Sequence, residues 1–116
     1  MKKLILEKIE KLGGRVSFVE LEKIPGFAGD QGFGFATYNI VCWINISDVF
    51  MRALHDLIKD EIVVIEAASP WVYLNDGYAL DLPLMKRNIK YKSPRWMPVV
   101  FNKGPNFYDA YWHVPA

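Results

Sequence analysis

The chain has 116 residues, of which 52 % are hydrophobic and 23 % are charged, and its formal net charge is +1. This length suits one domain with its own core, and this composition excludes wholesale disorder and a fibrous protein. A net charge so close to zero also excludes a strong overall field that would draw the whole molecule to nucleic acid or to a membrane.

Cys42 is the one cysteine, so no disulfide can form within the chain, and we expect a reducing, cytoplasmic location. The apolar run near the N-terminus is too short for a signal peptide. The longest uncharged stretch, residues 31–47, contains polar residues and glycine and is shorter than the roughly 20 mostly apolar residues that span a membrane. We therefore expect no membrane association.

The N-terminal quarter of the chain predicts two helices. Residues 2–12 have the amphipathic period of a helix, and a glycine pair marks its end. After a short strand, Ser17 and Glu20 are spaced as a capping box, which predicts a second, short helix that ends at Pro25. Two helices joined by a tight turn form the first half of a helix-turn-helix arrangement.

The next segment predicts a loop, a strand and a third helix. Residues 25–38 contain four glycines and follow neither the helical nor the strand period, so we expect a long loop. The continuous apolar run 40–46 predicts a buried strand. Ser47 then caps a third helix, whose apolar residues recur at helical spacing as far as Ile58.

A series of antiparallel strands is expected after the third helix. Residues 62–67 are β-branched, 71–74 alternate, and 78–82 follow the sequence Asn75-Asp76-Gly77, which is typical of a hairpin turn. Residues 83–116 hold five of the seven prolines and many aromatic residues. Proline prevents a long helix there, so we expect this segment to wrap the core or an interface.

This order of elements resembles a winged helix-turn-helix domain over residues 1–82. The stretch 47–66, SDVFMRALHDLIKDEIVVIE, is similar to the third helix and the following wing strand of such domains. The resemblance implies an α+β fold with a three-helix unit and a small antiparallel sheet. Residues 83–116 would be a proline- and aromatic-rich extension packed on the same domain. Many winged helices bind DNA and others only join proteins, so the fold alone does not decide the function.

The resemblance places the third helix in the major groove of DNA, where its exposed side chains contact base edges. Arg52, His55 and Lys59 would then be the nucleic-acid contacts. Asp48 and Asp56 each lie four residues from Arg52, so the alternative is a solvated helix face with internal ion pairs.

A second basic element lies between residues 86 and 96. It contains two aromatic residues, Tyr91 and Trp96, no acidic residue, and five cations: Lys86, Arg87, Lys90, Lys92 and Arg95. Such cations neutralise phosphates, and aromatic rings stack on unpaired bases. The same segment would also suit a strap over residues 24–81, which carry two basic and eight acidic side chains. Both interpretations remain open at this stage.

The sequence predicts no catalytic, cofactor-binding or metal site. One cysteine and two distant histidines lack the spacing of metal ligands, and the glycine-rich stretch lacks the lysine that follows a phosphate-binding loop. Aromatic residues in the predicted loop and near the C-terminus, if exposed, are candidates for a protein interface. These residues are Phe27, Phe33, Phe35 and Trp112.

Two functional hypotheses follow. The first is a non-enzymatic nucleic-acid-binding protein, with DNA as the partner and transcription regulation as the role. It predicts an affinity that falls steeply with salt. The second is a protein-interaction module of the same fold, working as a homodimer or with another protein. It predicts a salt-tolerant oligomer that Phe33→Ser or Trp112→Ala disrupts.

Overall fold

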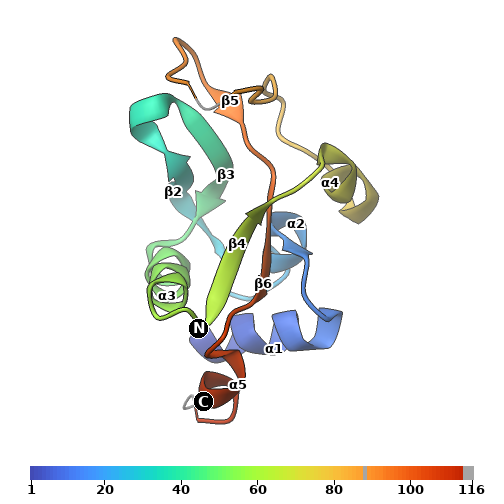
Figure 1. Ribbon diagram of the computed structural model, residues 1–116, viewed down its shortest axis with the longest axis vertical. Helices are drawn as coiled ribbons and strands as arrows, with labels where there is room; N and C mark the ends of the chain where they lie inside the picture. Colours follow the sequence, from blue (N-terminus) through green and yellow to red (C-terminus); the bar gives the residue numbers. More distant parts are fainter. Residues whose placement is uncertain (88, 114–116) are drawn as a thin grey trace.

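Five α-helices and two three-stranded sheets make up the computed structural model, which describes residues 1–87 and 89–113. The α+β class is therefore confirmed. The first sheet contains β1 (Val16–Ser17), β6 (Val99–Lys103) and β4 (Val63–Ala67), in that order, with antiparallel neighbours. The second contains β2 (Ala28–Phe35), β3 (Ile40–Ile46) and β5 (Arg95–Trp96). Figure 1 shows the two sheets one above the other along the 43 Å axis of the molecule.

The predicted end of the first helix and the predicted starts of the second and third helices at Ser17 and Ser47 are confirmed, whereas the second helix ends at Leu21 and not at Pro25. Helix α1 (Lys2–Leu12) ends at Gly13, which adopts a left-handed conformation with φ of 76°. The Ser17 hydroxyl accepts a hydrogen bond from the Glu20 amide at the start of α2 (Phe18–Leu21). Helix α3 (Asp48–Lys59) begins in the same way, because Ser47 accepts from the Phe50 amide at 3.1 Å.

The predicted loop at residues 25–38 is wrong, because β2 pairs antiparallel with β3 and only a 3₁₀ turn, η1 (Ala36–Tyr38), separates them. The register of this pair shifts at several positions. A Cβ atom at Gly34 would overlap the carbonyl oxygen of Ile40, so glycine allows the two backbones to approach closely. Glycine has a low strand propensity, so this glycine-rich sequence did not indicate a strand.

The predicted strands at 71–74 and 78–82 are also wrong. Residues Pro70–Asp76 form helix α4, which Ser69 caps by accepting from the Trp71 amide. Tyr73 of this helix is fully buried, and its hydroxyl donates to the carbonyl of Val99 at 2.6 Å. The burial of the Tyr73 ring and its hydrogen bond to Val99 thus attach α4 to the core.

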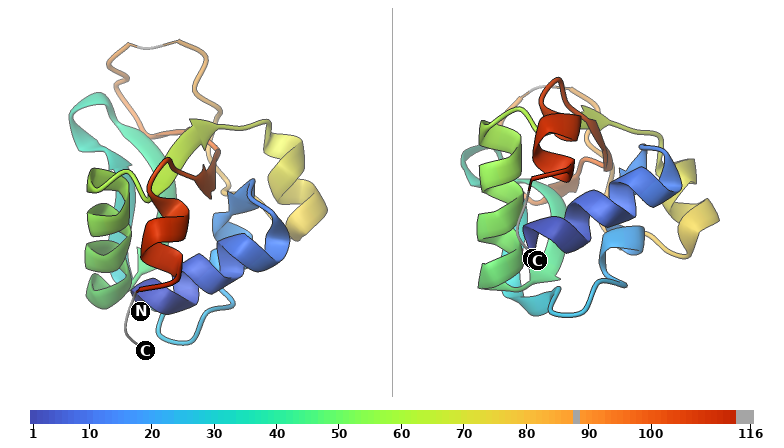
Figure 2. Two further views of the ribbon diagram at one scale, coloured as in Figure 1. Left: turned by 60° about the horizontal axis from the view of Figure 1, so that its bottom comes forward. Right: turned by 90° about the horizontal axis from the view of Figure 1, so that it is seen from below.

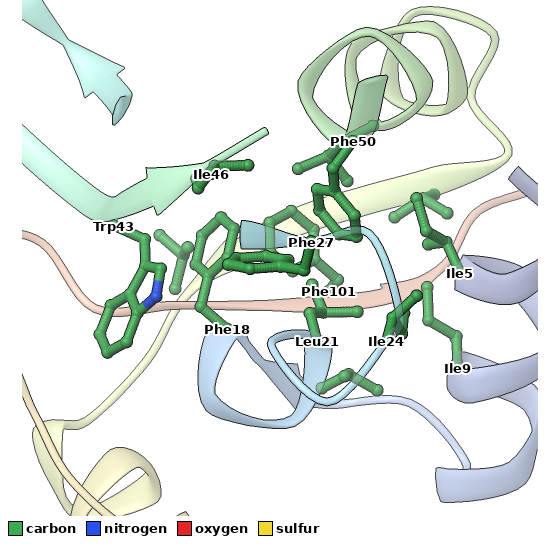
Figure 3. Close-up of a cluster of buried hydrophobic side chains, with 14 of the residues drawn as sticks. Ile5, Ile9, Phe18, Leu21, Ile24, Phe27, Trp43, Ile46, Phe50 and Phe101 are labelled. Carbon is green, nitrogen blue, oxygen red and sulfur yellow. The ribbon is translucent and has the colours of Figure 1, made fainter. Parts of the chain in front are cut away.

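The core forms where α1, α2, α3 and both sheets meet. Phe18 lies at its centre, stacked on Trp43 with ring centroids 6.0 Å apart and edge-on to Phe101 at 5.1 Å. Figure 3 shows these rings together with Phe27 and Phe50, which come from the segment before β2 and from α3. Each of the five side chains is at most 3 % exposed.

The C-terminal part of the chain joins the two sheets. Strand β6 lies between β1 and β4, and β5, just before it, pairs parallel with β3. Trp96 is buried, and its indole nitrogen donates to the carbonyl of Cys42 at 3.2 Å. Helix α5 (Phe107–Tyr111) then packs against α1, as does α3 (Figure 2). Among the described residues, the helices are too short or too polar to cross a membrane.

Candidate nucleic-acid interface

One end of the molecule gathers two segments that are distant in sequence. The loop that leads into β5, residues 83–95, lies beside the tip of the β2–β3 hairpin, residues 33–41, and α1 and α5 lie at the opposite end (Figures 1 and 2). We call residues 83–95 the basic loop, and the basic loop together with the hairpin tip the basic end. It contains all five cations that the sequence analysis singled out between residues 86 and 96.

Backbone hydrogen bonds attach the basic loop to the hairpin tip. The Tyr91 amide donates to the carbonyl of Tyr38 at 3.1 Å, and the Arg95 amide donates to the carbonyl of Asn39 at 2.9 Å. The Asn39 side-chain amide donates to the Tyr91 carbonyl at 2.8 Å. The loop is thus held at three points although its described residues before Arg95, 83–87 and 89–94, form no helix or strand.

Tyr91 also organises the basic loop from within. Its hydroxyl accepts from the amides of Lys86 and Arg87 at 3.0 and 2.9 Å and donates to the Arg87 carbonyl. The hydrogen bond with the Arg87 backbone lowers the pKa of Tyr91 below its usual value. The Arg95 guanidinium lies 4.9 Å from the centre of the Tyr91 ring and donates to the Leu84 carbonyl. Backbone groups and one ring therefore hold the loop, and its lysines form no ion pair with any residue of 1–87 or 89–113.

The charge at the basic end is of one sign. The basic loop carries five cations, and neither the loop nor the hairpin tip contains an acidic residue. Four of the five cationic side chains are exposed, and Arg95 is half-buried. Within residues 1–87 and 89–113, every ion pair joins side chains outside the basic end. The loop therefore covers an uncharged part of the acidic stretch 24–81, and its charge has not been neutralised by that stretch.

Two exposed rings lie next to these cations. Phe35 is 51 % exposed and Tyr38 is 48 % exposed. Together with Ile40, Met85 and Met97 they line an open apolar pocket at the junction of the hairpin tip and the basic loop. Exposed aromatic rings beside unpaired cations combine the two features that nucleic-acid interfaces use.

The exposed face of α3 differs from the basic end. Arg52 is paired with Asp48 at 2.7 Å, and Asp56 is paired with Lys2 at 3.2 Å. The Arg52–Asp48 pair lies within the helix, as the alternative predicted, whereas Asp56 pairs with Lys2 of α1. Arg52 therefore already has a carboxylate partner, whereas His55 and Lys59 have no ion pair among the described residues.

His55 and Lys59 face a groove that leads towards the basic end. The groove is apolar between them, and it is lined by Phe33 and Phe35 of β2, Ile58 of α3 and Ile65 of β4. The His55 ring meets the Phe33 ring at 5.6 Å between centroids. Phe35 lines both this groove and the apolar pocket, so the two hollows are neighbours.

The candidate interface aromatics have different environments. Phe27 does not meet the condition of exposure for an interface candidate, because it is 3 % exposed and its ring packs on Phe50 at 4.6 Å. Phe33 is half-buried, whereas Phe35 is exposed. Trp112 is 73 % exposed and lies beside α1, and Figure 1 shows α1 at the end opposite the basic end.

The described residues offer little for catalysis. Burial raises the pKa of the Cys42 thiol to about 12, so it is a buried apolar group and not a nucleophile at neutral pH. Within residues 1–87 and 89–113, no three His, Cys, Asp or Glu side chains come together in a group that could hold a metal ion.

Sequence reasoning missed Tyr38, Asn39, Met85 and Met97. Asn39 carries the one available signal, because it adopts a left-handed conformation with φ of 56°, which asparagine tolerates in turns.

Comparison of the chain with protein-family models, with curated proteins and with solved structures finds no match. A functional proposal for this protein therefore rests on the geometry of the basic end.

Proposed function

We propose that this chain is a non-enzymatic nucleic-acid-binding protein, with a DNA-binding, regulatory role, and that the basic end is its main contact. The observation that carries this proposal is the sign of the charge there: five cations stand together with no acidic residue in the basic loop or the hairpin tip. A polyanion such as nucleic acid releases counterions when these cations replace them, which favours binding.

The arrangement of the first sheet supports a winged-helix type of domain. Helices α1, α2 and α3 alternate with β1 and β4, and β6 lies between β1 and β4. In this interpretation the segment between β4 and β6 stands where a wing would be, and it contains the basic loop. The β2–β3 hairpin is an addition between the second and third helices.

The basic end is a better contact than α3 for an electrostatic reason. Duplex DNA carries one negative charge per roughly 1.7 Å of its axis, so a surface that mixes both signs gains little from approaching it. Helix α3 presents Asp48 and Asp56, and Asp60 and Glu61 follow directly. The basic end offers the phosphates no such repulsion.

The proposal predicts a defined salt dependence. If each of the five cations contacts one phosphate, the slope of log affinity against log salt is about −4.5 for a duplex and about −3.5 for a single strand. The affinity then falls by about 100-fold or more when the salt concentration rises fourfold.

The experiment compares two variants with the same change in charge. Lys86→Gln, Lys90→Gln and Lys92→Gln neutralise the basic loop, and the matched control neutralises three lysines of α1: Lys3, Lys8 and Lys11. Fluorescence anisotropy with labelled duplex and single-stranded oligonucleotides measures both affinities at two salt concentrations. We expect the loop variant to lose about 100-fold in affinity and the α1 variant to lose less than about 5-fold.

Two results would contradict the proposal. One is a wild-type protein that binds no oligonucleotide at low salt. The other is an equal loss of affinity in both variants, which would show that net charge and not the basic end determines binding.

A second candidate function rests on the aromatic C-terminal end. Trp112 is 73 % exposed beside Lys3, Leu6 and Glu7 of α1, which suits a protein interface. A self-association module predicts a dimer in sedimentation velocity that persists at high salt and dissociates in Trp112→Ala. A monomer at high concentration would remove this candidate.

A further inference from the structure

We infer that the basic end binds nucleic acid as a single strand, with bases stacked on the exposed rings of Phe35 and Tyr38. This inference rests on the proposed function and narrows it to one form of nucleic acid. Three features support it: the exposed rings, their attachment to the cations and the course of the neighbouring groove.

The exposed rings are best used where base faces are accessible. A phenylalanine ring offers no hydrogen bond to a base edge, and in a duplex the base faces are stacked on one another. In a single strand each base has a free face, and stacking on an aromatic side chain is favourable for every base. Phe35 and Tyr38 are each about half exposed, so their rings are available for such stacking.

The rings and the cations form one unit. The carbonyl of Tyr38 accepts from the Tyr91 amide, and Tyr91 in turn binds the amides of Lys86 and Arg87. Three hydrogen bonds through Tyr91 thus connect the backbone of Tyr38, which carries one of the exposed rings, to the backbones of Lys86 and Arg87. This arrangement suits a nucleotide, whose base and phosphate must be bound at neighbouring places.

The pocket beside the rings suits bases of different size. Met85 and Met97 line it with Phe35 and Tyr38. Methionine side chains are flexible and polarisable and adapt to different partners. The inference therefore predicts binding with little sequence preference.

The groove gives the strand a course beyond the pocket. Phe35 lies between the pocket and the groove, and Lys59 and His55 border the groove on the side of α3. A strand stacked on Phe35 would place its next phosphates near Lys59 and His55. Arg52, which is paired with Asp48, does not line the groove.

The test uses one sequence in three forms: single-stranded DNA, single-stranded RNA and duplex DNA. Affinities are measured by anisotropy for the wild type, for Phe35→Leu with Tyr38→Leu, and for a control with Trp71→Leu and Trp112→Leu, two exposed rings away from the basic end. We expect either single strand to bind at least about 10-fold more tightly than the duplex. The Phe35 and Tyr38 variant should lose about 10-fold or more for single strands only, and the control should lose none.

The outcomes separate this inference from the proposed function. Equal or tighter binding of the duplex, or an equal loss for duplex and single strand in the Phe35 and Tyr38 variant, overturns the single-strand inference and leaves nucleic-acid binding in place. No binding of any form overturns both. Thermal unfolding followed by circular dichroism shows whether each variant keeps the wild-type fold.

Discussion

The exposed face of α3 and the basic end both present cations, but the two regions use them differently. On α3, Arg52 is held by Asp48, and Asp56 is held by Lys2 from α1. At the basic end, the basic loop carries five cations, and neither this loop nor the hairpin tip contains an acidic residue. The number of cations on a surface therefore says little about binding, because nearby carboxylates decide whether those cations are available.

The two regions also differ in how they are supported. The opposite face of α3 is part of the core, where Phe50, Leu54 and Leu57 are fully buried. The described side chains of the basic loop are all exposed or half-buried, and the loop is held by backbone hydrogen bonds and Tyr91. Substitutions on the buried face of α3 therefore test stability, whereas those in the loop test binding.

The largest effect is expected for the buried face of α3. Leu54→Ala removes a fully buried side chain, and we expect a loss of about 2–5 kcal/mol in the free energy of unfolding. The matched loop variant Lys90→Ala should change it by less than about 0.5 kcal/mol, because the side chain is exposed. Urea denaturation measures both, and a comparable loss in Lys90→Ala would show that the loop is structural.

The next effect concerns the hairpin that supports the basic loop. A Cβ atom at Gly34 would overlap the backbone of β3, so we expect Gly34→Ala to lower the free energy of unfolding by about 1–3 kcal/mol. Gly32 is the control, because a Cβ atom there would meet only the Trp43 carbonyl oxygen, at an ordinary 3.6 Å. Thermal denaturation of the two variants should therefore separate them, and equal stability would mean that β2 and β3 do not pair as described.

A smaller effect separates two cations of α3 itself. Lys59→Gln should weaken single-strand binding by about 5-fold at roughly 0.1 M salt, because Lys59 borders the groove and one phosphate contact is lost. Arg52→Gln should weaken it by less than about 2-fold, since Arg52 is already paired with Asp48. Anisotropy titrations of both variants measure the two losses of affinity. A larger loss for Arg52→Gln would show that the exposed face of α3, and not the groove, contacts the nucleic acid.

The smallest effect is a pH dependence at the opposite end, where charges are paired. Lys103 forms an ion pair with Glu10, with 2.8 Å between Nζ and Oε2, and this contact lowers the pKa of that carboxyl below its ordinary value of 4.5. The folded pKa is depressed, so the stabilisation is complete above pH 4.5 and is lost as the pH falls through the folded value. We expect Glu10→Gln to lower the Tm at pH 7 and to match the wild type in acid. A difference in Tm that does not change with pH would exclude the ion pair as its cause.

Local sequence signals determined several elements of this protein. The end of α1 at Gly13 and the starts of α2 at Ser17 and α3 at Ser47 depend on residues within one turn of each other. The apolar run 40–46 and the β-branched run before Ala67 are strands for a similar reason, since their side chains favour extended backbone. The five cations of the basic loop could also be recognised from the sequence.

Only the tertiary structure decided the rest. Strand β2 depends on how closely Gly34 approaches β3, and α4 depends on the burial of Tyr73 against Val99. The pairing of β6 with β1 and β4 joins residues far apart in the chain, which no local period can reveal. The same holds for the basic end, because the bond from Tyr91 to Tyr38 brings the rings to the cations. The sequence determined which groups were charged or aromatic, and long-range backbone contacts decided which of them stand together.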